Sequence, residues 1–205
     1  MKEKRSIPLN KNFYTPNIND LIYTYLLKES TFYEGKRYLS NSNFVLARKA
    51  FCELMGITTR KFTYAFDKIL AAGLMVFDNT IYNVDQAYSF PPYTSGDRYQ
   101  LIDTDIIDIL VSKQIEHSIK LYTFLLNKIL YYGAGNYVFT FGMLAEELGW
   151  ASTNSRARTI VHQIMEQLKD LGLINYEEFF WEGKVKTSYP IKKQKLTFVK
   201  HISDS

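Results

Sequence analysis

The side chains with the clearest chemical potential lie in two short segments of the chain, residues 59–68 and 154–163. The candidate residues of the first segment are Thr59, Arg60, Lys61, Thr63, Tyr64 and Lys68. Those of the second segment are Asn154, Ser155, Arg156, Arg158, Thr159, His162 and Gln163. Arginine pairs with guanine and asparagine or glutamine with adenine, whereas lysine, serine and threonine commonly hold phosphates. The second segment therefore has the richer set of base-reading side chains, and the first is closer to a phosphate clamp.

Both segments also have the apolar spacing of a helix with one buried face. The residues that recur at this spacing are Phe62, Ala65, Phe66 and Ile69, and then Ile160, Ile164, Leu168 and Leu171. The candidate residues then lie on the outer face or in the N-terminal turn. Any solvated helix exposes polar side chains, but it normally mixes charges of both signs. Asp67 is the only acid before the last turn of the first helix, and residues 152–165 contain none, which favours an anionic partner.

Further basic residues lie near the two ends of the chain. Lys184 and Lys186 follow a turn at Glu182-Gly183, and we expect them to contact phosphates that flank the main site. Two more groups are Lys192, Lys193, Lys195 and Lys200 near the C-terminus, and Lys2, Lys4, Arg5 and Lys11 near the N-terminus. Each end is either a solvated tail or an arm that follows a nucleic-acid backbone, and we expect the second.

The residues that catalysis would need are scattered. His117, His162 and His201 are isolated from one another, and with Cys52 as the single cysteine neither a zinc cluster nor a disulfide framework is expected. The sequence has no glycine-rich phosphate loop of the Walker type. The acidic residues at 103, 105 and 108 suit the start of a helix, where carboxylates favour the positive end of the dipole. We therefore expect no enzyme, no catalytic residue, no metal and no cofactor.

Composition is that of a globular protein with a mild basic excess. The chain has 205 residues, of which 46% are hydrophobic, and a formal net charge of +4, which makes a nucleic-acid partner plausible. No apolar run reaches the roughly 18 residues of a membrane span, and no signal segment follows the charged N-terminus. We expect a cytoplasmic protein without a membrane partner.

Three landmarks occur twice in the chain and in the same order. The matching pairs are 22–27 with 121–126, 51–56 with 144–149, and 70–75 with 169–174. The offset is 99 for the outer pairs (121 − 22 = 99 and 169 − 70 = 99) and 93 for the middle pair (144 − 51 = 93). Chance explains one such match but hardly three in order, so the sequence predicts two copies of one structural unit.

Each copy has the pattern of three helices followed by a β-hairpin. The first copy predicts helices over 19–28, 46–55 and 59–72 and strands over 74–77 and 81–84. The second copy predicts helices over 118–130 and 141–148, a third from about 154 to 171, and strands over 173–180 and 184–189. Gly56 and Gly149 end the second helices, as a C-terminal glycine does. Residues 103–113 predict one more helix between the copies.

This order resembles the winged helix-turn-helix superfamily. The resemblance rests on Glu53-Leu54-Met55-Gly56-Ile57-Thr58 and Glu147-Leu148-Gly149-Trp150-Ala151-Ser152, and on the Gly-Leu pairs that end the segments Leu70–Leu74 and Leu168–Leu173. The tandem arrangement is similar to plasmid replication initiators and phage replication-organiser proteins of low-GC bacteria. The resemblance implies that the last helix of each copy enters the major groove of DNA.

The expected fold is mainly α with small β-hairpins, an α+β chain of two winged-helix domains in tandem. Residues 1–84 are expected to form the first domain with a basic N-terminal arm, and 105–205 the second with a basic C-terminal tail. Residues 85–104 are expected to be a linker, because 88–96 is rich in proline, glycine and serine.

The expected function is sequence-specific binding of double-stranded DNA by a protein of a plasmid or phage, in DNA replication initiation or transcription regulation. A homodimer and replication or transcription proteins are further expected partners. The alternative is a winged-helix module for protein–protein interaction, such as a chromosome-condensation accessory subunit. That class tends to be acidic on its exposed helices, whereas the exposed faces here are basic, which favours DNA.

Overall fold

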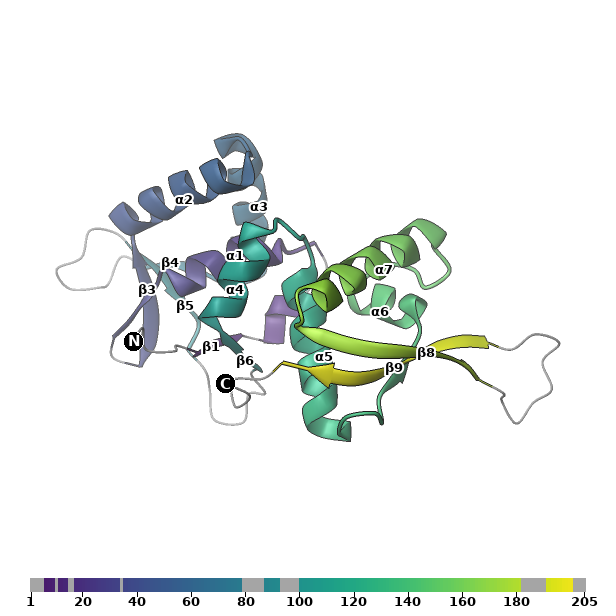
Figure 1. Ribbon diagram of the computed structural model, residues 1–205. Coiled ribbons are helices and arrows are strands. Elements are labelled where there is room, and N and C mark those ends of the chain that lie inside the picture. Colours follow the sequence, from purple (N-terminus) through teal and green to yellow (C-terminus); the bar gives the residue numbers. More distant parts are fainter. Residues whose placement is uncertain are drawn as a thin grey trace. The chain divides into compact units, whose positions relative to one another are not determined.

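The structure, a computed structural model, describes residues 6–9, 11–14, 17–33, 35–78, 87–92, 100–181 and 191–200. Contacts divide the chain into two compact units, unit 1 over Met1–Ile119 and unit 2 over Lys120–Ser205. Both units combine helices with small antiparallel sheets (Figure 1). The expected mixture of helices with small β-elements is confirmed at this level.

Unit 1 has two antiparallel sheets and four α-helices among the described residues. Its elements are β1 (Ser6–Leu9), a 3-10 helix (Lys11–Tyr14), α1 (Asp20–Lys28), β2 (Thr31–Tyr33), β3 (Lys36–Ser40), α2 (Asn41–Met55), α3 (Thr59–Ala71), β4 (Val76–Asp78), β5 (Ala87–Phe90), β6 (Gln100–Asp103) and α4 (Thr104–Ser112). The larger sheet has the strand order β2-β3-β5-β4, and β1 pairs separately with β6. Both sheets are antiparallel.

Aromatic side chains fill the core of unit 1. Phe51 and Phe62 are buried with their ring centroids 5.9 Å apart, and Tyr23 lies 5.5 Å from Phe13. The buried carboxylate of Asp20 accepts hydrogen bonds from the backbone N–H groups of residues 117 and 119, both at 2.9 Å. Asp20 therefore joins the start of α1 to the chain that leads out of unit 1.

Unit 2 has one three-stranded sheet and three α-helices among its described residues. Its elements are α5 (Ser118–Tyr132), which begins at the boundary between the units, β7 (Val138–Phe139), α6 (Phe141–Glu147), α7 (Ser155–Asp170), β8 (Ile174–Trp181) and β9 (Ile191–Val199). The strand order is β7-β9-β8 and both pairings are antiparallel. Phe139 is fully buried and packs against Tyr137 and Tyr176, with centroid distances of 5.8 and 5.9 Å.

The two units repeat one order of elements. A helix, a strand, two helices and two strands occur in this order as α1, β3, α2, α3, β4 and β5 in unit 1, and as α5, β7, α6, α7, β8 and β9 in unit 2. Unit 1 has the additional strand β2 between α1 and β3. In both sheets the last strand of this series lies between the other two. Gly56 and Gly149 have φ angles of 61° and 80° at matching turns. Six of these seven helices form within two residues of their expected bounds, whereas α2 begins at Asn41, five residues before its expected start at residue 46.

Two expectations about the connecting segments were wrong for the residues that the structure describes. Residues 87–90 of the expected linker are β5, which pairs with both β3 and β4, and residues 100–103 are β6. The expected C-terminal tail is in large part β9, paired with β8 from Ile191 to Val199. Backbone pairing with strands far away in the sequence holds both segments, and their own composition does not reveal it. The expected return strands 81–84 and 184–189 lie outside the described residues.

The strands β3 and β7, which precede the second helix of each unit, were not predicted. Both are short, and each pairs with a strand more than 45 residues later, although β3 also pairs with the adjacent β2. In the described part of the chain, no helix combines the length and the apolar character that a membrane crossing requires.

Candidate nucleic-acid interface

The outer face of α7 carries the second group of candidate residues, and all of them are exposed. They are Asn154, Ser155, Arg156, Arg158, Thr159, His162 and Gln163. Asn154 begins the helix, because its side-chain oxygen accepts a hydrogen bond from the N–H of Ala157 at 3.2 Å. The hydroxyl of Thr159 donates to the carbonyl of Ser155 at 3.0 Å. The capping hydrogen bond of Asn154 therefore fixes where α7 begins, and the polar side chains lie on its exposed face from that point.

The buried stripe of α7 is rotated slightly from the expected one. Its buried members are Ala157, Val161, Ile164, Met165 and Leu168. Ile164 and Leu168 are confirmed as core residues, whereas Ile160 and Leu171 are only half-buried. The apolar residues of this helix are compatible with more than one buried stripe, and packing against α6 and the sheet determines which one is buried.

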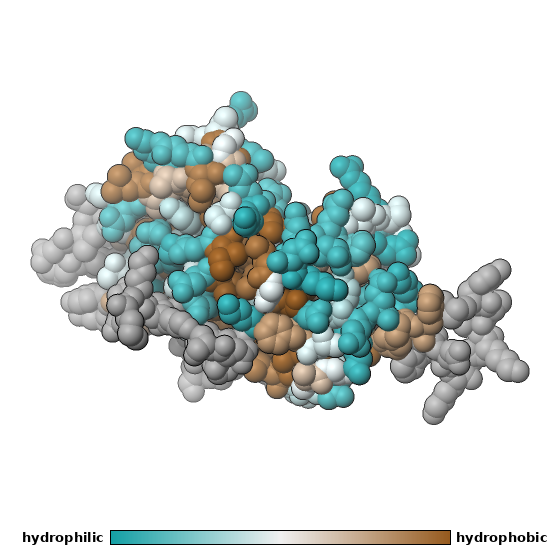
Figure 2. All heavy atoms as spheres, in the orientation of Figure 1, coloured by the Kyte–Doolittle hydropathy of each residue, from teal (hydrophilic) through white to brown (hydrophobic). Residues whose placement is uncertain are grey.

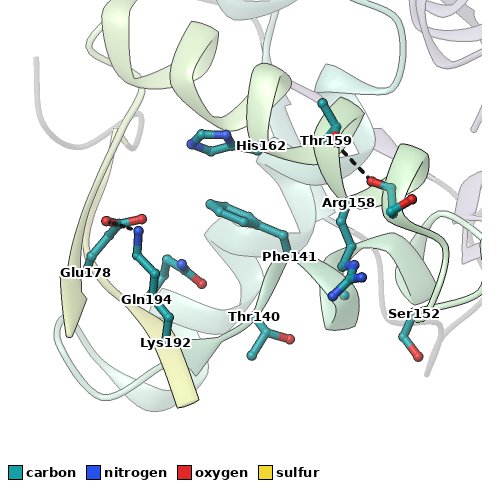
Figure 3. A pocket seen from close by; sticks show the side chains of 11 residues that line it. Thr140, Phe141, Ser152, Arg158, Thr159, His162, Glu178, Lys192 and Gln194 are labelled. Atoms are coloured by element: carbon teal, nitrogen blue, oxygen red, sulfur yellow. Dashed lines mark hydrogen bonds and ion pairs between the residues drawn. The ribbon is translucent and has the colours of Figure 1, made fainter. Parts of the chain in front are cut away.

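A pocket of about 660 Å³ lies between α7, the start of α6 and the hairpin of β8 and β9 (Figure 3). Its lining side chains come from three separate parts of unit 2. From α7 these are Ser155, Arg158, Thr159 and His162; from the start of α6 and the loop before α7 they are Thr140, Phe141 and Ser152; and from the hairpin they are Glu178, Lys192 and Gln194. Gly142 also lines the pocket. A Cβ at this position would lie 3.1 Å from the carbonyl oxygen of Ser152, so the wall leaves little room for a side chain there.

The charges in this pocket are distributed unevenly. On the hairpin, Lys192 Nζ lies 2.7 Å from Glu178 Oε2. Hydrogen bonds from Lys192 and Gln194, and the proximity of His162, hold the pKa of Glu178 below its usual range. On the helix, the guanidinium of Arg158 makes no ion pair or hydrogen bond with any residue that the structure describes. Figure 3 shows Arg158 on the opposite side of Phe141 from the Glu178–Lys192 pair. The unpaired positive charge therefore lies on the α7 side.

His162 links the pocket to the packing of unit 2. Its ring lies 4.7 Å from Phe141, and its Nε2 is 3.8 Å from Glu166 Oε1. Glu166 also accepts a hydrogen bond from the hydroxyl of Tyr176. Burial, followed by that hydrogen bond, raises the pKa of Tyr176, so this hydroxyl stays protonated. His162 thus has a packing role beside its exposed edge.

The first group of candidate residues lies on α3 of unit 1. Thr59, Arg60, Lys61, Thr63 and Tyr64 are exposed, and Lys68 is half-buried. The Nζ of Lys68 lies 4.5 Å from the centroid of the Tyr64 ring. Phe62, Phe66 and Ile69 are buried as expected, and Ala65 is half-buried. The structure therefore places this group on one exposed helix face, as it does the group on α7.

Aromatic side chains occupy the space between α3 and the strands of unit 1. Tyr88 on β5 lies 4.7 Å from Phe44, 5.1 Å from Phe66 and 5.4 Å from Phe77. The corresponding space in unit 2 is the open pocket described above, which has charged side chains in its wall. The two units therefore share an order of elements but differ in the chemistry beside the third helix.

The buried stripes also align the two helices with each other. At the offset of 99 that relates Gly73 to Gly172, the buried Phe62 and Phe66 correspond to the buried Val161 and Met165. Arg158 then corresponds to Thr59, and Arg60 to Thr159. Arg156 precedes the start of α3 in this alignment.

Some site residues fall outside the earlier expectation or outside the described residues. Lys184 and Lys186 lie in the part of the chain that the structure does not describe. Glu178, Gln194 and Phe141 were missed, because they reach the pocket only through the pairing of β8 with β9 and the packing of α6 on α7. Lys192 was noticed as a basic tail residue, but its partner Glu178 depends on hairpin register, which the sequence left undefined.

Among the described residues, no group of three or more histidine, cysteine and acidic side chains is placed to hold a metal ion. Comparison of the chain with models of protein families, with curated proteins and with solved structures finds no match.

Proposed function

We propose that the chain is a sequence-specific double-stranded DNA-binding protein of a plasmid or phage, in which each unit is a winged helix. The proposal is supported by the element order common to both units and by the central position of the last strand in both sheets. A winged helix has this arrangement, with its third helix free to enter the major groove. Replication initiation or transcription regulation is the proposed role.

The observation that carries the proposal is the exposed face of α7 beside the pocket. Over its first three turns this face has arginine, serine, threonine, histidine and glutamine side chains and no acid. The helix has 16 residues, or roughly 24 Å of length at about 1.5 Å per residue. In the proposed complex α7 lies in the major groove, and a phosphate of the flanking backbone binds at Arg158 in the pocket.

Binding of labelled duplexes, measured by fluorescence anisotropy at several salt concentrations, tests this proposal. The logarithm of affinity should fall linearly with the logarithm of salt concentration, with a slope of about −0.9 for each neutralised phosphate. Affinity that stays flat between low and moderate salt would point to a protein partner instead.

Footprinting on DNA that flanks the gene separates the two proposed roles. A protected set of direct repeats supports replication initiation, whereas a protected promoter supports transcription regulation. The protected duplex is the cognate site in the experiments below.

A second candidate function, a protein–protein interaction module or a homodimer, is favoured by the apolar surface of α2. Leu46 is 65% exposed on this helix, and Val45 and Leu54 are also exposed. Figure 2 shows hydrophobic side chains on the surface where Figure 1 places α2. Light scattering of the free chain tests for the homodimer, and Leu46→Lys should abolish any dimer that uses this face.

A further inference from the structure

We infer that Glu178 is a specificity-determining residue of the DNA interface, because its carboxylate neutralises Lys192 and keeps the DNA backbone on the Arg158 side of the pocket. This inference rests on the proposed function, since it concerns how unit 2 holds a duplex. It predicts that a negative charge inside a DNA interface lowers affinity for wrong sequences more than for the cognate site.

An ion pair with Lys192 orients the carboxylate of Glu178. Lys192 Nζ lies 2.7 Å from Glu178 Oε2. Gln194, the cross-strand neighbour of Glu178 in the pairing of β8 with β9, also lies in the pocket wall and is only 3% exposed. The ion pair with Lys192 therefore orients the carboxylate within the pocket wall.

The net charge on the two sides of the pocket decides where a phosphate binds. On the hairpin side the charges of Glu178 and Lys192 cancel, and both side chains are about half exposed, at 43% and 54%. A phosphate that approaches Lys192 therefore also meets a carboxylate. On the α7 side the guanidinium of Arg158 has no hydrogen-bond or ion-pair partner among the described residues, and its geometry suits a phosphate. The backbone is accordingly drawn to Arg158.

This arrangement acts differently on cognate and other sequences. On the cognate site, base contacts by α7 already fix the backbone near Arg158. On a scrambled site no base contact fixes the backbone, so it would also bind Lys192 if that lysine were unpaired. Since the hydrogen bonds from Lys192 and Gln194 keep the pKa of Glu178 below its usual range, the carboxylate stays charged near neutral pH.

The test compares the full chain with its Glu178→Gln variant on the cognate duplex and on a scrambled duplex of the same composition. Glutamine keeps the size of the side chain but removes the charge. We expect about fivefold tighter binding of the scrambled duplex near 0.1 M salt, and a salt slope more negative by about 0.9, equivalent to one added phosphate contact. The gain on the cognate duplex should be smaller. If the glutamine variant misfolds, Glu178→Thr replaces it in the test, because threonine is favourable in a strand. The same gain in affinity for the scrambled duplex is then expected.

Two further variants show whether the effect belongs to the pocket. Glu178→Gln combined with Lys192→Ala restores the net charge and should return scrambled-site affinity to within about twofold of the wild type, since the added phosphate contact is lost. Asp108→Asn is the matched control, because it removes a carboxylate paired with Lys28 outside the pocket. An equal gain from Asp108→Asn would overturn the inference, since overall charge would then explain the result.

The remaining outcomes are also decisive. The inference is contradicted if Glu178→Gln binds the scrambled duplex no more tightly than the wild type does, or if it gains equally on both duplexes. The proposed function then still holds, provided that the wild type binds in a salt-dependent way. Absence of duplex binding by the wild type contradicts both.

Discussion

Arg156 and Arg158 are two residues apart but have different surroundings on α7. Arg158 lines the pocket beside the hairpin, whereas Arg156 does not. Arg156 shares a stripe of the helix with Gln163, since seven residues make about two turns, and both side chains are exposed. We therefore expect Arg156 and Gln163 to read bases, and Arg158 to hold a backbone phosphate.

Single alanine variants of the two arginines test this division. Arg156→Ala should cost about 1–3 kcal/mol on the cognate duplex and relax the preference at one base position, because a bidentate base contact is lost. Arg158→Ala should weaken cognate and scrambled duplexes by the same factor and make the salt slope shallower by about 0.9, because a phosphate contact carries no base information. Competition binding on both duplexes measures the two effects.

The outcome for Arg156 decides whether unit 2 reads sequence through this helix. If Arg156→Ala lowers both affinities equally, Arg156 is a phosphate contact and the assignment of base reading to it is wrong. Lys169, in the last turn of α7, provides the control: its Nζ lies over the Tyr176 ring at 4.9 Å, and Lys169→Ala should leave base preference unchanged.

At the scale of an element, the turn between α2 and α3 is set by Gly56. Its φ of 61° is in the left-handed region, and its N–H bonds to the carbonyl of Glu53 at 3.3 Å. Thr58 then begins α3 by accepting a hydrogen bond from the N–H of Lys61 at 3.2 Å. The direction of the exposed face of α3 therefore depends on a short turn with one unusual backbone conformation.

Substitution of Gly56 measures what this conformation contributes. A Cβ at this position would meet no atom within 4 Å, so the cost of Gly56→Ala is backbone strain alone, about 1–2 kcal/mol. Gly56→Asn should cost less, because asparagine tolerates the left-handed region better. Urea denaturation of the two variants gives the free energies of unfolding. Equal stability of Gly56→Ala and the wild type would contradict the strain argument.

At the scale of the whole molecule, each unit has a core of its own. Phe62 is fully buried in unit 1, and Phe139 is fully buried in unit 2. Because apolar burial is the main favourable contribution to folding, loss of one core should first destabilise the unit that contains it. The two units are therefore expected to lose protection against hydrogen exchange separately.

Phe139→Ala tests this independence. It should destabilise unit 2 by about 3–5 kcal/mol, the usual range for truncating a buried phenylalanine. Amide exchange measured by mass spectrometry should accelerate in α6, α7 and β9 before it does in α2 and α3. Phe62→Ala should give the reverse order. Simultaneous loss of protection in both units, by either variant, would mean that the chain unfolds as one cooperative body.

The sequence by itself determined the local features of this protein. The repeat, the seven α-helices of the described residues, the turns at Gly56 and Gly149 and the exposed polar faces of α3 and α7 all follow from residues close together in the chain. Helical periodicity and capping depend on neighbours within about four residues, so a single sequence carries them.

Only the tertiary structure decided what lies beside those faces. The pairing of β3 with β5 and of β7 with β9 joins distant segments, and many registers were compatible with their short apolar patterns. The strand register then brought Glu178 next to Lys192, while packing of α6 on α7 placed Phe141 beside His162. The physical reason is that strand pairing and helix packing are satisfied by partners far away in sequence, whereas the signals of a helix are local.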